Sequence, residues 1–143
     1  MKYREEIFAV LRFHKLRLTK TRQAVVELFV RNETPLSVPD ILLALHKRQA
    51  GVNKTTVYRE LERLQAIGVL EPVQLGDRKQ YYELASRKHH HHLVCLQCER
   101  VEDIDMDEAV LFAEERKWSR EKHFIILRHS LEFFGLCRQC QAA

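Results

Sequence analysis

Residues 54–84, KTTVYRELERLQAIGVLEPVQLGDRKQYYEL, change from a helical pattern to a strand-like one. From Val57 onward, apolar residues recur at intervals of four and three, which is the spacing of one buried helical face. Gly68 then follows as a helix-ending residue. The runs VLEPVQL and KQYYEL flank Gly-Asp-Arg at 76–78, which is typical of a hairpin tip. The stretch therefore predicts a helix over about 54–67 and a β-hairpin after it.

Three further helices are predicted upstream of this stretch. The first covers 4–16, the second covers 19–32, and the third begins after Ser37, which can cap it. Either Thr19 or Thr21 can cap the second helix. The buried faces of these helices are predicted to hold Ile7, Val10, Leu11, Leu16, Val25, Val26, Leu28, Phe29, Ile41, Leu42 and Leu45. Helices followed by a hairpin occur in this order in a winged helix-turn-helix domain.

Charge is unevenly divided along the chain. Residues 1–84 hold 15 Lys/Arg and 10 Asp/Glu, a net charge of +5. Residues 85–143 hold 9 and 10, a net charge of −1. A basic first half favours contact with a polyanion, although ordinary surface charge gives the same balance.

The outer face of the predicted helix over 54–67 carries groups that suit DNA. Thr55, Tyr58 and Arg59 lie opposite the apolar stripe. Their hydroxyl, phenol and guanidinium groups can contact phosphates or base edges. Two basic pairs elsewhere can follow a phosphate backbone: Arg17 with Lys20, and Arg78 with Lys79. A solvated helix with neighbouring ion pairs has the same periodicity, so periodicity alone favours DNA binding only slightly.

Four cysteines form two Cys-x-x-Cys pairs, separated by 38 residues: Cys95 with Cys98, and Cys137 with Cys140. Such a pair places two thiolates on one tetrahedral ion, and two pairs complete a four-thiolate zinc shell. Disulfides are a less common use of these pairs in a cytosolic chain, and unrelated redox pairs are the alternative. Because the gap is long, the predicted structural Zn²⁺ site ties together distant parts of the chain.

Four consecutive histidines, His89 to His92, directly precede Leu93-Val94-Cys95. If this run is extended, His90 and His92 point one way, and His89 and His91 point the other. Each pair can offer two imidazoles to its own metal, and added carboxylates suit Fe²⁺, Mn²⁺, Co²⁺ or Zn²⁺. The nearby carboxylates are Glu83, Glu102, Asp103, Asp105, Asp107 and Glu108. A solvated histidine strand is the alternative interpretation.

The rest of the second half predicts a mixture of helix and strand. DEAVLFAEERKW (107–118) has the pattern of an amphipathic helix, and FIILRHSLEFF (124–134) favours one or two strands. Phe124, Phe133 and Phe134 are expected at the surface of this small unit, which would gain from a partner. A symmetric homodimer would place two recognition helices on two half-sites.

Length and composition fit two small domains in a globular α+β chain. The chain has 143 residues, 45% hydrophobic and 31% charged. We expect a winged-helix DNA-binding domain at 1–84 and a small α/β metal-binding dimerisation domain, with the four-cysteine zinc site, at 85–143. No apolar run is long enough for a membrane span, and Glu5 and Glu6 interrupt any signal peptide. We therefore expect a cytoplasmic protein without a membrane partner.

Together these motifs resemble the ferric uptake regulator (Fur) family. The resemblance covers about residues 7–140 and is carried by LTKTR at 18–22, TTVYR at 55–59, HHHHLVCLQC at 89–98 and the terminal Cys-x-x-Cys. It implies a dimeric, metal-dependent transcriptional repressor of metal-homeostasis or peroxide-stress genes. Such a protein binds AT-rich inverted repeats in double-stranded DNA when its metal is present. The family is not enzymatic and takes no small molecule beyond metal ions or peroxide.

The resemblance also assigns residues to sites. It gives structural zinc to the four cysteines. It implies a regulatory site made of Glu83, His90, His92 and Asp103. It implies an additional site made of His89, His91, Glu108 and His129. From the residues and the resemblance together, the predicted DNA-binding residues are Arg17, Thr19, Arg22, Thr55, Thr56, Tyr58, Arg59 and Arg78.

The chain departs from the family pattern at two positions. Pro35 stands where the family commonly has a regulatory histidine, which implies a four-ligand site, weaker coupling, or a replacement such as His14 or His46. Glu99 stands where the family usually has Gly after the second cysteine. Asp103 favours peroxide sensing, but Pro35 removes a histidine that such sensors oxidise. The sensed signal therefore stays open among Fe²⁺, Mn²⁺, peroxide and Zn²⁺.

Two other classes of function are carried as alternatives. The histidines and carboxylates are also compatible with a zinc-binding metalloenzyme that activates a water. However, the sequence has no HExxH motif, nucleophile elbow or phosphate loop. A metal buffer or interaction module without DNA binding is the other alternative.

Overall fold

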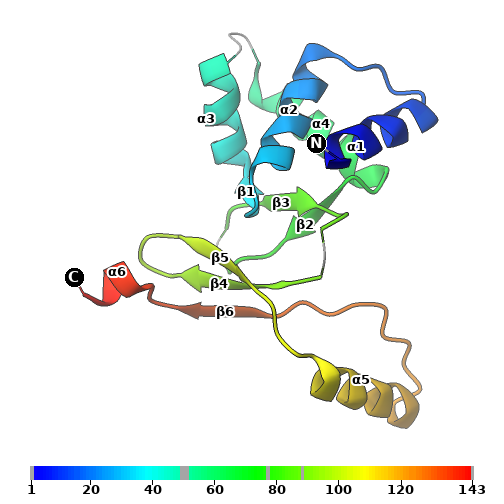
Figure 1. Ribbon diagram of the computed structural model, residues 1–143, viewed down its shortest axis with the longest axis vertical. Coiled ribbons are helices and arrows are strands. Elements are labelled where there is room, and N and C mark those ends of the chain that lie inside the picture. Colours follow the sequence, from blue (N-terminus) through cyan, green and yellow to red (C-terminus); the bar gives the residue numbers. More distant parts are fainter. Residues whose placement is uncertain (1, 49–51, 77, 88, 143) are drawn as a thin grey trace. The chain divides into compact units, whose positions relative to one another are not determined.

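The computed structural model describes residues 2–48, 52–76, 78–87 and 89–142 (Figure 1). Its internal contacts divide the chain into two units, residues 1–88 and 89–143. This division lies close to the boundary expected at 84/85. Asp77, in the predicted hairpin tip, lies outside the described residues.

The first unit is built from helices and a small antiparallel sheet. Its elements are α1 (Lys2–Phe13), α2 (Lys20–Arg31), β1 (Leu36–Ser37), α3 (Val38–Arg48), α4 (Lys54–Ala66), β2 (Leu70–Val73) and β3 (Tyr81–Leu84). Strand β3 is central and pairs with β1 on one side and β2 on the other. The predicted winged-helix order, with the hairpin directly after the fourth helix, is confirmed.

One hydrophobic core joins these helices to the sheet. Leu11 of α1, Ile41 of α3 and Leu61 of α4 are completely buried, and Tyr82 of β3 is 1% exposed. Each such aliphatic side chain contributes about 1.5–3 kcal/mol relative to exposure. Because the sheet shares this core with α4, the hairpin and the outer face of α4 belong to one packed body.

Local capping explains where the helices begin and end. Thr19 caps α2, and its Oγ1 accepts a hydrogen bond from the Arg22 backbone N–H at 3.2 Å. Ser37 starts α3, and its Oγ accepts from the Asp40 N–H at 3.2 Å. Gly68 follows α4 with a φ of 76°, a conformation that favours glycine.

The first helix differs from the prediction in two ways. It ends at Phe13 rather than near residue 16, and Leu16 packs only partly buried against the core. Val10 is 36% exposed, so its predicted burial was wrong. Ile7 and Leu11, one turn apart, fill the contact with the core, and Val10 lies at the edge of that face.

The second unit is a three-stranded sheet with two helices in its described residues. Its elements are β4 (His91–Cys95), β5 (Val101–Ile104), α5 (Ala109–Glu121), β6 (Glu132–Gly135) and α6 (Arg138–Gln141). Central β4 pairs antiparallel with β5 and parallel with β6. The predicted α5 helix and one strand near residue 134 are confirmed, but residues 124–131 are not strand. Among the described helices, none combines the length and apolarity that a membrane span requires.

Candidate metal centres and nucleic-acid interface

The four cysteines come together at one end of the second unit's sheet. Cys95 ends β4, Cys98 lies in the turn before β5, and Cys137 and Cys140 lie at the start of α6 and within it. The four sulfur atoms all lie within 4.8 Å of one another. The parallel pairing of β4 with β6, which places Cys95 opposite Gly135, brings the two distant pairs together. The structure thus gathers all four predicted zinc ligands.

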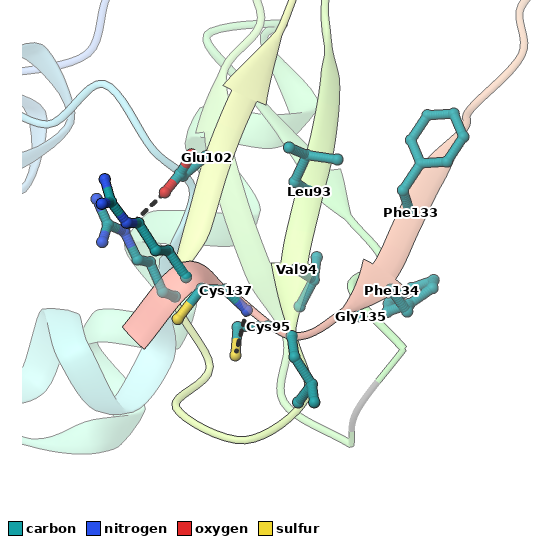
Figure 2. Close-up of a pocket in the computed structure, with 11 residues that line it drawn as sticks. Leu93, Val94, Cys95, Glu102, Phe133, Phe134, Gly135 and Cys137 are labelled. Carbon is teal, nitrogen blue, oxygen red and sulfur yellow. Dashed lines mark hydrogen bonds and ion pairs between the residues drawn. The ribbon is translucent and has the colours of Figure 1, made fainter. Parts of the chain in front are cut away.

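Hydrogen bonds favour the thiolate form of one of these cysteines, Cys95. The Cys137 backbone N–H donates to Cys95 Sγ at 3.4 Å, as Figure 2 shows. This bond, with that from the Cys98 backbone, lowers the pKa of Cys95 to about 6. In contrast, sharing a hydrogen bond with the Cys137 thiol raises the pKa of Cys140 to about 12. Four thiolates this close repel one another unless a cation is bound, and the all-sulfur donor set suits Zn²⁺.

The turn that leaves Cys98 holds an unusual backbone conformation at Glu99. Glu99 has a φ of 63°, in the left-handed region that favours glycine. Its N–H donates to the Cys95 carbonyl at 3.0 Å, and the Cys95 N–H donates to the Arg100 carbonyl at 2.9 Å. This tight turn therefore holds a glutamate in a conformation for which glycine is suited.

A first histidine cluster lies between β4 and β5. His90 Nε2 and His92 Nε2 are 3.1 Å apart. An Asp103 carboxylate oxygen lies 3.9 Å from His90 Nε2 and 3.7 Å from His92 Nε2. The antiparallel register explains this approach, because His92 is directly opposite Asp103. Two imidazoles and one carboxylate form a mixed N/O donor set that suits Fe²⁺, Mn²⁺ or Zn²⁺.

Glu83, the fourth residue predicted for this site, belongs to the first unit. It lies on β3, is 5% exposed, and has a carboxylate oxygen 3.1 Å from Arg87 Nη1. Its participation as a metal ligand stays a prediction.

A second cluster gathers three imidazoles around one carboxylate. Glu108 Oε1 lies 3.1 Å from His89 Nε2 and 2.9 Å from His129 Nε2, and it also contacts His91 Nε2. Glu108 directly precedes α5, and His129 lies in the segment before β6. The structure thus brings all four residues of the predicted additional site together. The alternation of side chains at the start of β4 separates this cluster from the first one.

Contacts within this cluster shift the pKa values of Glu108 and His129 in opposite directions. Burial tends to raise the pKa of Glu108, but contacts with the three imidazoles outweigh it and lower the pKa to about 2. Burial tends to lower the pKa of His129, but contacts with Glu108 and Glu115 outweigh it and raise the pKa. The carboxylate is therefore ionised at neutral pH and ready to bind a cation.

Glu115 was missed by the sequence analysis. Its carboxylate lies 2.7 Å from His129 Nδ1, the ring nitrogen that does not face Glu108. This contact fixes which nitrogen of the ring faces the cluster. The sequence could have predicted this contact, because Glu108 and Glu115 are seven residues apart and so lie on the same side of α5.

An apolar groove lies beside the four cysteines. We define it by Leu93, Phe133, Phe134 and Leu136, which are 40%, 42%, 47% and 50% exposed. Figure 2 shows Leu93 and Phe133 on neighbouring strands, with Cys95 and Cys137 below them. At the groove's polar edge Arg100 Nε lies 2.9 Å from a Glu102 carboxylate oxygen. In addition, α5 has no buried residue in the described structure.

Most residues of the predicted nucleic-acid interface are accessible. Thr55, Thr56 and Arg59 of α4 are exposed, as are Arg17, Thr19 and Arg78. Tyr58 is half-buried, and the Lys54 ammonium lies 5.8 Å from its ring centre. The Thr56 hydroxyl donates to Asn53 Oδ1 at 3.0 Å, so Thr56 and Thr19 both belong to helix N-termini.

Arg22, which was predicted to belong to this interface, is buried. Its side chain is only 4% exposed, and its guanidinium makes two hydrogen bonds of 2.8 Å to the Glu60 carboxylate. A guanidinium paired in this way inside the domain cannot reach a phosphate. The prediction of a DNA contact for Arg22 was therefore wrong.

The chain is similar to known proteins over most of its length. A model of the ferric uptake regulator family matches residues 14–134. The Bacillus subtilis ferric uptake regulation protein is 35% identical over 130 residues, which cover 87% of this chain and 85% of the relative. A Staphylococcus aureus peroxide-responsive repressor, PerR, is 27% identical over 137 residues, covering 96% of this chain and 90% of the relative.

Solved structures share the fold. The Helicobacter pylori ferric uptake regulator, described as having three functional metal-binding sites, gives a TM-score of 0.78 at 21% identity. That match covers 98% of this chain and 92% of the other. The family match, the 35% identical relative and the shared fold agree. The chain belongs to the ferric uptake regulator family of metal-responsive transcriptional regulators.

Proposed function

We propose that this protein is a homodimeric repressor that binds AT-rich inverted repeats in double-stranded DNA when a divalent metal occupies the first histidine cluster. The observation that carries the proposal is the convergence of His90, His92 and Asp103 at the start of the second unit. These three donors are one short of a four-ligand shell. Glu83, shortly before them in the chain and at the end of the winged-helix unit, is the proposed fourth ligand.

The proposed switch is a shift between conformations. When bound, the metal supplies the positive charge that Glu83, His90, His92 and Asp103 share. In the metal-bound state Glu83 would exchange its ion pair with Arg87, at 3.1 Å, for a place in this shell. Because Glu83 and the histidines belong to different units, their joint coordination would fix the angle between the two units. Only the affinity difference between the DNA-competent angle and the others drives the shift.

Pro35 limits the number of ligands in this proposal. Its ring nitrogen is part of the backbone and cannot bind a metal, so Pro35 contributes no ligand from the loop between α2 and β1. The site is therefore proposed to have four ligands. His14 and His46 lie in the first unit and are not required as replacements.

Exposed apolar surface supports a homodimer. The apolar groove and the uncovered α5 leave large aromatic and aliphatic side chains in water, including Phe124, which is 64% exposed. A second copy of the chain would cover such a surface. A symmetric dimer would then present two α4 helices to successive half-sites, with Arg59 at base edges or phosphates.

In this proposal neither histidine cluster is catalytic, the four-cysteine site holds structural Zn²⁺, and the DNA target places the protein in the cytoplasm. Iron, manganese and zinc all suit the N/O donors of the first cluster. The test is fluorescence anisotropy with an AT-rich inverted-repeat duplex from the region upstream of the protein's own gene. Chelator, Mn²⁺, anaerobic Fe²⁺ and Zn²⁺ are compared at fixed salt.

Metal-dependent tightening supports the repressor, and the most effective ion identifies the sensed metal. A folded, zinc-containing dimer that binds metal but no duplex would contradict the proposal and favour a metal buffer. Metal-dependent turnover of a hydrolysable substrate would instead favour a metalloenzyme.

A further inference from the structure

Arg22 of α2 and Glu60 of α4 form an ion pair inside the winged-helix unit. The two side chains are 4% and 8% exposed. Arg22 Nε donates to one Glu60 carboxylate oxygen and Nη2 donates to the other, each at 2.8 Å. This bidentate arrangement fixes direction as well as distance, since the guanidinium and carboxylate must lie nearly in one plane.

The same guanidinium makes a third contact. Arg22 Nη1 donates to the backbone carbonyl of Arg17. Arg17 lies in the loop before α2 and exposes its own side chain. One buried group therefore connects the recognition helix α4 to the loop that carries Arg17.

Stability alone does not account for such a pair. Two charges lose hydration when they are buried, and a well-packed apolar pair of similar volume is often as stable or more stable. The surrounding core already unites the two helices, because Val25 of α2 and Leu61 of α4 belong to one hydrophobic cluster and are completely buried. The bidentate ion pair also fixes the position of α4 along α2, which non-directional apolar contacts do not fix.

We propose that Arg22 and Glu60 are positioning residues for DNA recognition. They hold α4 and the Arg17 loop at one relative position, so that Arg59, adjacent to Glu60, and Arg17 meet the same duplex in register. This inference rests on the proposed DNA-binding function. It explains why Arg22, which the motif at 18–22 suggests as a DNA contact, is buried.

The test separates positioning from stability. In Arg22→Met the buried Glu60 carboxylate loses its bidentate partner and keeps only the largely exposed Arg63 guanidinium, 3.5 Å away, so this variant loses stability. In the double variant Arg22→Met/Glu60→Met both charges are removed, and its melting temperature returns to near that of the unchanged protein. Its affinity for the inverted-repeat duplex nevertheless falls by about tenfold or more, the scale of one lost base contact. Its affinity for a random duplex and its metal content stay unchanged.

The matched control is Arg4→Met/Glu27→Met. This variant removes an ion pair of 3.1 Å between α1 and α2 whose side chains are 45% and 29% exposed and do not reach α4. It is expected to keep the full ratio of specific to non-specific binding. A second test variant, Arg22→Lys, keeps the buried positive charge but loses the planar fork. It is expected to lower that ratio even if the double variant does not fold.

Failure of the positioning role can be distinguished from failure of the proposed function. If the unchanged protein binds no duplex with any metal, the proposed function fails. If it binds, but the stable double variant or Arg22→Lys binds the inverted repeat with unchanged specificity, the positioning role is wrong and the pair is only structural.

Discussion

His92 on β4 and Asp103 on β5 are direct partners across an antiparallel ladder, and His92 Nε2 lies 3.7 Å from an Asp103 carboxylate oxygen. The sheet's own hydrogen bonds thus set the distance between these two donors. His90 reaches the same point because it is two residues away along an extended chain. Donors placed by a sheet are preorganised, so metal binding requires little rearrangement within this unit.

Loss of zinc is predicted to unfold the second unit. In Cys95→Ser one thiolate is replaced by a poor zinc ligand, and structural zinc in small domains contributes about 10–16 kcal/mol of folding free energy. That exceeds the stability of most small domains. We expect zinc content below one ion per chain, with loss of the slow hydrogen exchange of β4 and β6. A folded, zinc-free Cys95→Ser protein would contradict the structural role of the site.

The Glu99 turn predicts a stabilising substitution. A non-glycine residue in the left-handed region costs roughly 1–2 kcal/mol, and glycine's greater freedom in the unfolded chain offsets part of the gain. Glu99→Gly should therefore raise the free energy of unfolding of the second unit by about 0.5–1 kcal/mol. Glu99→Ala is the control, because it removes the side chain but keeps the backbone conformation. Equal stability in the two variants would show that the turn is not strained.

The convergence of the four cysteines could be predicted from sequence because its information is local. The spacing of each Cys-x-x-Cys pair already brings its two sulfurs close together. Only the approach of one pair to the other depends on the fold. The histidine run was similar, because alternation along a strand separates the two sets of imidazoles. The helix ending at Gly68 and the hairpin after it were also set by short-range patterns.

The errors concern contacts between distant segments. Burial of Arg22 depends on Glu60, which is 38 residues away and pairs with it only once α2 packs on α4. Residues 124–131 have the apolar and β-branched composition of a strand, but only 132–135 pair with β4. Periodicity could not predict which part of that run would find a partner strand.

The second histidine cluster predicts a pH dependence in metal-free protein. The pKa of His129 is raised above its ordinary 6.5, so its contribution is complete below pH 6.5 and is lost as the pH rises through the raised value. The pKa of Glu108 falls from 4.5 to about 2, so its contribution is complete above 4.5 and is lost towards pH 2. The cluster should therefore stabilise the metal-free protein most between these limits.

This dependence can be measured with His129→Ala. In a mild chelator that leaves the four-cysteine zinc in place, the loss of melting temperature should be larger near pH 6 than near pH 8.5. His123→Asn is the control, since His123 is exposed and asparagine tolerates its φ of 51°. A loss that grows with pH would have the wrong sign for the proposed contacts.

Arg59 is predicted to contact DNA. It is exposed on α4, and its removal should weaken binding to the inverted repeat by about 1–3 kcal/mol without changing metal uptake. Arg31→Ala on α2 is the control, with a guanidinium 61% exposed and 3.7 Å from Glu27, away from the Arg22–Glu60 pair. Anisotropy titrations across several salt concentrations distinguish a base contact from a phosphate contact. Unchanged affinity and salt slope in Arg59→Ala would remove it from the interface.

We propose that the cluster of His90, His92 and Asp103 controls DNA binding. The most direct measurement compares the unchanged protein with His90→Ala/His92→Ala, by anisotropy on the inverted-repeat duplex while Mn²⁺ is increased at fixed salt. Both proteins should remain dimeric with one zinc per chain. We expect Mn²⁺ to tighten binding only in the unchanged protein. Equal tightening by Mn²⁺ in the zinc-containing double variant would contradict it.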